Sequence, residues 1–183
     1  MRTKPKLKLP TEDRLKRSAV HYLERYASSS ANLRRVLERR VLKACFDHDK
    51  DPAEYAALID VVIDKCVSSG LVNDHTYAET KTASLRRRGG SKRKIEAQLS
   101  SKGIERQTIA EIVEDDPEAE MQAALVFARR RRLGRYRSYS GTSKRDPLIQ
   151  RDKDLAAMCR AGFSFDIARQ IIDAVDDGGS DQP

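Results

Sequence analysis

Apolar residues recur along this chain at every third or fourth position, and they almost never alternate with polar ones. Spacing of this kind places them on one face of an α-helix. The clearest stripe contains Tyr55, Leu58, Ile59, Val62, Ile63 and Cys66. The other stripes are shorter, so each helix must bury its apolar face against neighbouring helices. The pattern predicts an all-α fold built from short helices.

Helix starts are marked by capping residues. Asp51 precedes Pro52, and Glu54 lies three residues after the aspartate, which predicts a capped helix beginning at Pro52. Asp116 and Pro117 repeat the same start. We also expect Ser91 to cap the helix that follows it.

Helix ends are marked by Gly70, Gly103 and Gly162. Each glycine is followed by an apolar residue and preceded four positions earlier by another. This pattern predicts the Schellman ending, in which a left-handed glycine closes the helix. We therefore assign these glycines, with Asp51 and Pro52, a structural role.

The chain contains an internal repeat. A shift of about 59 residues lays the segment 99–104 on 158–163, and a shorter shift lays 85–90 on the segment 128–134. The second copy then contains an insertion, residues 135–151, which is rich in Ser, Gly and Arg and is expected to be a mobile loop.

Each repeat unit is predicted to hold three short helices in a helix-turn-helix-like arrangement. Tandem units of this kind stack into a curved, elongated array. The predicted organisation is a flexible basic tail (1–11), a divergent first repeat (12–72), a second repeat (73–115), a third repeat carrying the insertion (116–176) and a disordered tail (177–183).

Basic residues outnumber acidic ones, 36 to 28, which gives a formal net charge of +8. A charge of this size favours a nucleic acid or another polyanionic partner. The candidate contact residues are Arg86, Arg87, Arg88, Lys92, Arg93, Lys94, Arg129, Arg130, Arg131 and Arg135. A solvated helix face remains the alternative for any one of them.

The helical stripe of Met121, Ala124, Leu125 and Ala128 predicts how one basic cluster is arranged. Continued at 100° per residue, it places Arg132 near the buried face and Arg130 opposite, in solvent. Arg132 is then expected to lay its methylene groups along the core.

No group of residues has the spacing of a catalytic, cofactor or metal site. The three histidines have no metal-ligand spacing. The acidic segment 47–51 has Pro52 and Leu58 where a calcium loop needs Gly and Glu. The segment 89–92 follows no predicted strand, so it is not a phosphate loop. We expect no enzyme activity and no cofactor.

Three scattered cysteines indicate small core residues in a reducing compartment. No secretory signal and no apolar run of membrane-spanning length is visible. The expected location is the cytoplasm, and we expect no membrane partner.

Several segments together resemble the RecX family of regulators of the RecA recombinase. They are, in order, residues 22–30 (YLERYASSS), 32–37 (NLRRVL), 69–74 (SGLVND), 77–78 (YA), 102–104 (KGI) and 160–166 (RAGFSFD). The resemblance covers roughly residues 14–175. The chain departs from the family's usual pattern at residues 39–57, which are longer and more acidic, and after Gly134.

The resemblance implies a protein that binds RecA and its filament on single-stranded DNA. It would inhibit filament extension, ATP hydrolysis and strand exchange, and so modulate homologous recombination and the SOS response. Binding to nucleic acid alone would be weak and non-specific, and the chain would be a monomer. The alternative is a helix-turn-helix transcription regulator, which would need one base-reading helix and a defined half-site spacing.

Overall fold

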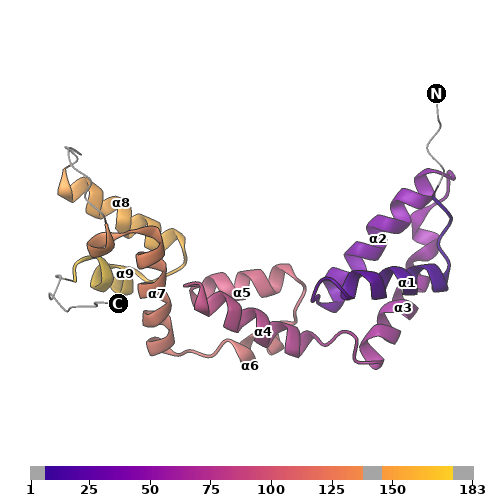
Figure 1. Cartoon of the computed structure of the whole chain (residues 1–183), viewed down its shortest axis with the longest axis horizontal. Helices are drawn as coiled ribbons and strands as arrows, with labels where there is room; N and C mark the ends of the chain where they lie inside the picture. Colours follow the sequence, from indigo (N-terminus) through magenta and orange to yellow (C-terminus); the bar gives the residue numbers. More distant parts are fainter. Residues whose placement is uncertain (1–6, 138–145, 175–183) are drawn as a thin grey trace. The chain divides into compact units, whose positions relative to one another are not determined.

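The computed structural model describes residues 7–137 and 146–174, and within these ranges the chain is helical without strands (Figure 1). The all-α prediction is confirmed. The helices are α1 (Glu12–Leu23), α2 (Ser30–Phe46), α3 (Ala56–Ser68), α4 (Asp74–Arg87), α5 (Lys92–Ser101), α6 (Arg106–Ile112), α7 (Pro117–Arg131), α8 (Pro147–Arg160) and α9 (Phe165–Ile172), with 3-10 turns η1 (Pro52–Tyr55) and η2 (Gly134–Tyr136).

The described residues form two compact units. The first holds residues 7–79 and 100–108, and the second holds 80–99, 109–137 and 146–174. The division crosses α4, α5 and α6, so the middle group of three helices contributes to both units. The boundaries of the three predicted repeats stay predictions, as does the curvature of the array.

In the first unit, α1, α2 and α3 pack around one apolar core (Figure 1). Leu33 and Leu37 of α2 and Val62 of α3 lie in its centre, and all three are essentially inaccessible to solvent. The third helix begins differently from the prediction. Asp51 accepts a hydrogen bond from the Ala53 N–H (2.9 Å), but it caps the 3-10 turn η1, and the α-helix starts only at Ala56.

In the second unit, α7, α8 and α9 enclose a core of small and large residues in contact. Ala124 and Ala128 of α7, Met158 of α8 and Ala168 of α9 are fully buried. Alanines on α7 and α9 let the helices approach closely, and Met158 fills the remaining space.

The predicted glycine endings are present, with φ of 73° at Gly70, 76° at Gly103 and 98° at Gly162. At Gly162 both hydrogen bonds of the Schellman motif form, from the Phe163 N–H to the Met158 carbonyl (3.3 Å) and from the Gly162 N–H to the Cys159 carbonyl (2.9 Å). Gly89 (φ 76°) ends α4 in the same way, although it was not among the predicted endings, because Gly90 and not an apolar residue follows it.

The predicted repeat is confirmed in the placement of the helices. α5 ends at Ser101 and α8 at Arg160, whereas α6 begins at Arg106 and α9 at Phe165, so both pairs are 59 residues apart. The shorter shift also holds, because the Leu85 carbonyl accepts from the Gly90 N–H (2.8 Å) as the Ala128 carbonyl does from Leu133 (2.9 Å).

Two details of the third repeat differ from the prediction. Residues 147–151, expected in the mobile loop 135–151, form the first turns of α8, which Asp146 caps. Residues 138–145 of that loop, residues 1–6 of the predicted tail 1–11 and the predicted tail 177–183 lie outside the described residues. Residues 7–11 of the first tail are described, and Leu7 is hydrogen-bonded to Asp47. Helix α7 ends at Arg131, and Arg132 itself has the left-handed conformation (φ 55°).

A joint of the same construction occurs once in each unit. In the first joint, the Ser29 hydroxyl donates to the Lys102 carbonyl (2.6 Å), and the Ser30 N–H donates to Asp74 Oδ1 (2.7 Å). In the second joint, the Ser91 hydroxyl donates to the Ala161 carbonyl (2.6 Å).

The second joint also repeats the carboxylate contact. The Lys92 N–H donates to Glu120 Oε2 (2.9 Å), as the Ser30 N–H does to Asp74. Both serines also cap their own helices, since Ser29 accepts from the Asn32 N–H (3.2 Å) and Ser91 from the Lys94 N–H (3.3 Å). The joints dock the start of one repeat's second helix on the glycine ending of the next repeat's second helix.

Candidate nucleic-acid interface

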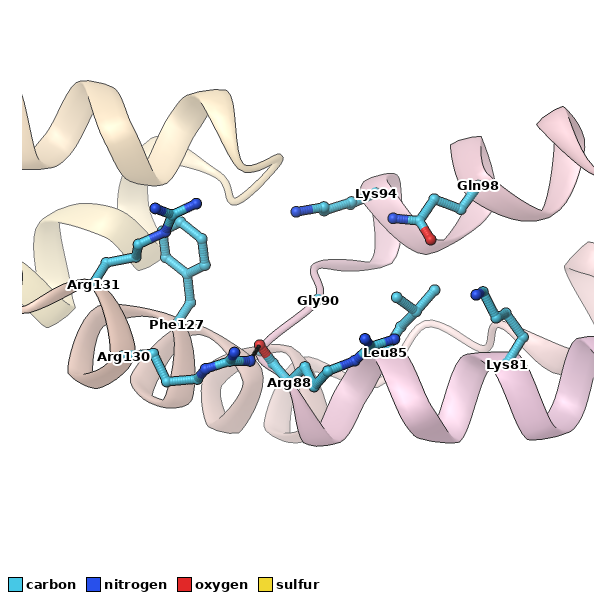
Figure 2. A pocket seen from close by; sticks show the side chains of 10 residues that line it. Lys81, Leu85, Arg88, Gly90, Lys94, Gln98, Phe127, Arg130 and Arg131 are labelled. Carbon is cyan, nitrogen blue, oxygen red and sulfur yellow. Dashed lines mark hydrogen bonds between the residues drawn. The ribbon is translucent and has the colours of Figure 1, made fainter.

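A polar groove with a volume of about 510 Å³ lies in the second unit between α4, α5 and α7 (Figure 2). We call it the basic groove. Its lining residues are Lys81, Leu85, Arg88, Gly89, Gly90, Lys94, Gln98, Phe127, Arg130 and Arg131. Five of these side chains are cationic and none is a carboxylate, so the groove presents one sign of charge to a ligand.

The turn at Gly89 and Gly90 brings the walls of the groove together. A Cβ added to Gly89 would lie 2.6 Å from the Phe127 nitrogen, and one added to Gly90 would lie 2.9 Å from the Leu85 carbonyl oxygen. Only glycine permits so close an approach of α7 to the end of α4. The groove therefore depends on the backbone of this turn as well as on its basic side chains.

Two of the arginines are held in place by backbone carbonyl groups. Arg88 Nε donates to the Ser84 carbonyl (3.2 Å), and Arg130 Nη1 donates to the carbonyl of Arg88 (2.9 Å; Figure 2). A guanidinium has five N–H donors, so each arginine keeps most of its donors for a ligand. Because the hydrogen bonds fix both side chains, less conformational entropy is lost when an anion binds.

Phe127 lines the groove beside Arg131 (Figure 2). The guanidinium of Arg131 lies over its ring, 5.9 Å from the centroid, and the ring packs at 5.6 Å against Phe163. The aromatic face is covered by this arginine, so it is not an open platform for a stacked base. What the groove offers a ligand is mainly charge and N–H donors.

The structure brings four of the predicted contact residues together and separates the others. Arg88, Lys94, Arg130 and Arg131 line the basic groove. Arg87, Arg93 and Arg129 are exposed but lie outside its lining. Arg135 is stacked over the ring of Tyr136, 5.0 Å from its centroid.

Arg86 and Lys92 instead belong to the second joint. Arg86 forms an ion pair with Glu120, and the two side chains are only 19% and 15% exposed. Lys92 Nζ lies 3.1 Å from Asp115, and its backbone N–H is bound by Glu120. These two basic residues form ion pairs within the fold, an arrangement that is neither the predicted partner contact nor the alternative of a solvated helix face.

The prediction for Arg132 is wrong, whereas Arg130 is exposed as predicted. The exposed Arg130 side chain also donates a hydrogen bond to the Arg88 carbonyl, which the sequence did not predict. Arg132 is exposed and lies beyond the end of α7, so it does not continue the buried stripe. The extrapolation failed because it assumed that the helix continues to residue 132, where the backbone leaves the helical conformation.

Comparison with known proteins agrees with this architecture. The family model "RecX, second three-helix domain" matches residues 73–112. A protein of Myxococcus xanthus named "Regulatory protein RecX" is 41% identical over 162 residues, which cover 87% of this chain and 84% of the relative. The chain belongs to the RecX family. A relative of the same name from Agrobacterium fabrum is 29% identical over 85% of this chain and 79% of its own length.

Solved structures of RecX proteins have the same fold. One matches with a TM-score of 0.63 at 16% identity, covering 89% of this chain and 72% of the other. The RecX protein of Lactobacillus salivarius matches with a TM-score of 0.60 at 19% identity, covering 88% of this chain and 94% of the other. At these identities the likeness shows the fold alone.

The RecX relatives are named as regulatory proteins and not as enzymes. In the described part of the chain, no three His, Cys, Asp or Glu side chains are grouped so as to hold a metal ion. Every helix within residues 7–137 and 146–174 is too short or too polar to span a lipid bilayer.

The buried cysteines of this RecX-family chain lie in environments that disfavour the thiolate, which is the nucleophilic form. Burial raises the pKa of the Cys45 thiol, and the nearby carboxylates of Glu54 and Asp51 raise it further. Burial likewise raises the pKa of Cys66. Both thiols stay protonated and belong to the apolar core, as predicted from the sequence.

Besides Leu85 and the two glycines of the turn, sequence reasoning missed Lys81, Gln98 and Phe127 in the lining of the basic groove. A helical pattern could have found two of them. Lys81 lies seven positions before Arg88, and Gln98 lies four after Lys94, so each shares a helix face with a predicted residue. Phe127 carried no such signal, because its place in the wall depends on the approach of α7 to Gly89.

Proposed function

We propose that this chain regulates a RecA recombinase by binding its filament on single-stranded DNA. In this role it inhibits filament extension, ATP hydrolysis and strand exchange, and modulates recombination and the SOS response. The proposal is supported by membership of the RecX family and by one structural observation. Five cationic side chains from three helices converge on a groove whose lining contains no carboxylate.

The chemistry of the basic groove suits a phosphate backbone. Lysines and arginines that neutralise phosphates release counterions, which gives affinity without sequence readout. Since Arg131 covers the Phe127 ring, base stacking contributes little to binding. Binding to DNA alone is therefore weak, independent of sequence and steeply dependent on salt, and stable association requires the recombinase as well.

The arrangement favours this function over a transcription regulator. A helix-turn-helix regulator reads base edges with side chains from one helix placed in the major groove. In this chain the cations come from α4, α5 and α7 and face a shared hollow. A hollow lined from three sides fits a strand backbone better than a flat duplex edge.

The test is an assay of RecA-dependent ATP hydrolysis on single-stranded poly(dT). The wild-type protein is expected to suppress hydrolysis at a substoichiometric ratio to recombinase. The double variant Arg88→Glu/Lys94→Glu places two carboxylates in the basic groove, and we expect it to need at least about tenfold more protein for the same inhibition.

The matched control is Arg87→Glu/Arg93→Glu, which makes the same charge change one residue away, outside the lining. Inhibition by this control is expected to lie close to that of the wild type. Equal loss in both double variants would show that net charge, not the groove, carries the effect. No inhibition by wild type at a one-to-one ratio in low salt would overturn the proposal. Tight binding to one duplex sequence would support the transcription regulator instead.

A further inference from the structure

A second groove, with different chemistry, lies in the first unit between α1 and α2. It consists of two adjoining hollows of about 230 and about 300 Å³, which share Ser18 and Arg40 in their linings. We call it the α1–α2 groove. The function proposed above does not use it.

The floor of the α1–α2 groove is apolar. Leu15, Val41 and Ala44 line one hollow together with the segment that precedes α1. Val36 lines the other, with tyrosines at its end. These are the side chains expected under an apolar ligand group, because covering such surface removes it from water.

The segment before α1 is fixed as one wall of this groove. The Leu7 N–H donates to Asp47 Oδ2 (2.9 Å), and a ring nitrogen of His48 lies 2.7 Å from the Leu7 carbonyl oxygen. Arg14 Nη1 donates to the Leu9 carbonyl (2.8 Å). The hollow is therefore preformed by hydrogen bonds that tie this segment to both helices.

The rim of the α1–α2 groove is basic. The cationic residues among the linings are Lys8, Arg14, Arg17, Arg25, Arg39, Arg40 and Lys43, and neither lining contains a carboxylate. In the described part of the chain none of these seven is in an ion pair with a carboxylate. Their charge is available to an anionic partner.

An apolar floor with a cationic rim matches one kind of partner. We propose that the α1–α2 groove docks an acidic amphipathic segment of a protein, with apolar side chains in the two hollows and carboxylates against the rim. Helices and turns that carry Leu or Phe every third or fourth residue among Glu and Asp have this character. Charge complementarity sets the orientation of the segment, and burial of the anchors supplies the affinity.

The floor argues against a nucleic acid in this groove. Nucleic acid strands bind to proteins through phosphate contacts and through bases stacked on aromatic rings. The centre of the α1–α2 groove is aliphatic, and its tyrosine pair, Tyr22 and Tyr26, packs together with ring centroids 5.2 Å apart. The basic groove differs in this respect, because its cationic side chains surround a polar hollow and not an aliphatic one.

The test is fluorescence anisotropy with a labelled peptide of about 14 residues, with leucine at every third or fourth position and glutamate elsewhere. A peptide with lysine in place of glutamate is the control for charge, and a poly(dT) oligonucleotide is the nucleic acid probe. The acidic peptide is expected to bind the full chain, and the lysine peptide is not.

Two variants probe the α1–α2 groove by different means. Arg17→Glu/Arg40→Glu reverses two exposed charges, one on each helix, and should weaken binding of the acidic peptide at least about tenfold. Ser18→Phe fills the place where the hollows meet and should also weaken it. The control Lys153→Glu/Arg160→Glu reverses two exposed charges on α8, and Arg88→Glu/Lys94→Glu alters the basic groove. Neither should change binding of the peptide.

The outcomes separate this proposal from the proposed function. No binding of the acidic peptide in low salt would overturn it, as would an unchanged Kd in Arg17→Glu/Arg40→Glu. If poly(dT) displaces the peptide and loses as much affinity in that variant, the α1–α2 groove is a nucleic acid site and the proposal fails. Loss of inhibition on changing the basic groove is measured independently of all three results.

Discussion

The two joints of this chain have the same construction but different residues around them. In each, a buried capping serine donates to the carbonyl before a glycine ending, and the next N–H donates to a carboxylate. The first joint adds the hydroxyl of Ser30 on Asp74, whereas the second adds the guanidinium of Arg86 on Glu120. Groups fixed by the backbone define the joint, and the side chain that completes it can differ.

A third glycine ending, at Gly70, shows what the joints require. Its φ of 73° is close to that of Gly103, but a Cβ added there would meet nothing within 4 Å. A Cβ on Gly103 would overlap that of Ala31, and one on Gly162 would lie 2.5 Å from the Ser91 hydroxyl. The same local sequence pattern thus marks a helix end in one place and a helix end in contact with a neighbour in two others.

The largest effect is expected from Gly103→Ala compared with Gly70→Ala. Both changes place a Cβ at positive φ, which costs about 1–2 kcal/mol. Gly103→Ala also forces the Cβ into Ala31, so we expect a total of about 2–4 kcal/mol. The measurement is urea denaturation of each variant. Equal losses of stability would show that the first joint is looser than the structure indicates.

The next largest loss of stability is expected when the carboxylate of either joint is removed. Glu120→Ala leaves the Lys92 N–H and the half-buried guanidinium of Arg86 without their partner, and we expect a loss of about 2–3 kcal/mol. Asp74→Ala leaves only uncharged groups without a partner, namely the N–H and the hydroxyl of Ser30. We expect this change to cost about 1–2 kcal/mol.

Denaturation of both variants, beside Glu120→Gln, checks this order. Glutamine keeps an acceptor for the Lys92 N–H but removes the charge, so it should recover part of the loss. A larger loss for Asp74→Ala would mean that the ion pair contributes less than the hydrogen bonds of the first joint.

The helices and their repetition were predictable because they follow from local patterns. Apolar spacing, Asp-Pro starts and glycine endings act over a few residues, and the shift of 59 residues recurs in the observed helix ends. The joints were not predictable in this way. The contact of Ser91 with Ala161 joins residues 70 positions apart, and serine before a helix indicates a cap whether or not its hydroxyl also meets a neighbour.

The candidate site also depends on contacts between residues far apart in the sequence, which local patterns do not predict. Arg86 and Arg88 lie two residues apart in one basic run, yet one is paired with Glu120 and the other lines the basic groove. Charge along the sequence identifies the cluster but not the carboxylate that approaches from α7. Arg132 was misplaced for a related reason, since the end of α7 at Arg131 was not recognised.

A smaller effect, of opposite sign, is expected at the end of α7. Arg132 occupies the position that Gly89 occupies at the end of α4, and both are left-handed. Arg132→Gly relieves the strain of a side chain at positive φ and should raise stability by about 0.5–1 kcal/mol. Thermal denaturation checks this, with Arg129→Gly, inside the helix, as a control that should lower stability by a similar amount. A fall in stability for Arg132→Gly would restore a packing role for that arginine.

The smallest effect on stability is expected for the exposed ion pair between Arg151 and Asp173. It can be compared with the less exposed pair between Arg86 and Glu120 in the second joint. Arg151 binds Asp173 through two nitrogen–oxygen contacts of 2.6 and 2.7 Å, and this hydrogen bonding lowers the pKa of Asp173 below its usual value of about 3.8. A carboxyl group whose pKa is lower in the folded state stabilises the fold above its unfolded pKa, and this contribution is lost as pH falls through the folded value. The melting temperature of wild type should therefore exceed that of Asp173→Asn slightly near neutral pH, and the difference between the two melting temperatures should close below pH 3.8.

Because both side chains are 38% exposed, added salt should also reduce this difference in melting temperature. Asp152→Asn, which alters the longer 3.7 Å contact of the same arginine, is the control and should show almost no gap at any pH. A gap that widens as pH falls would contradict the lowered pKa of Asp173.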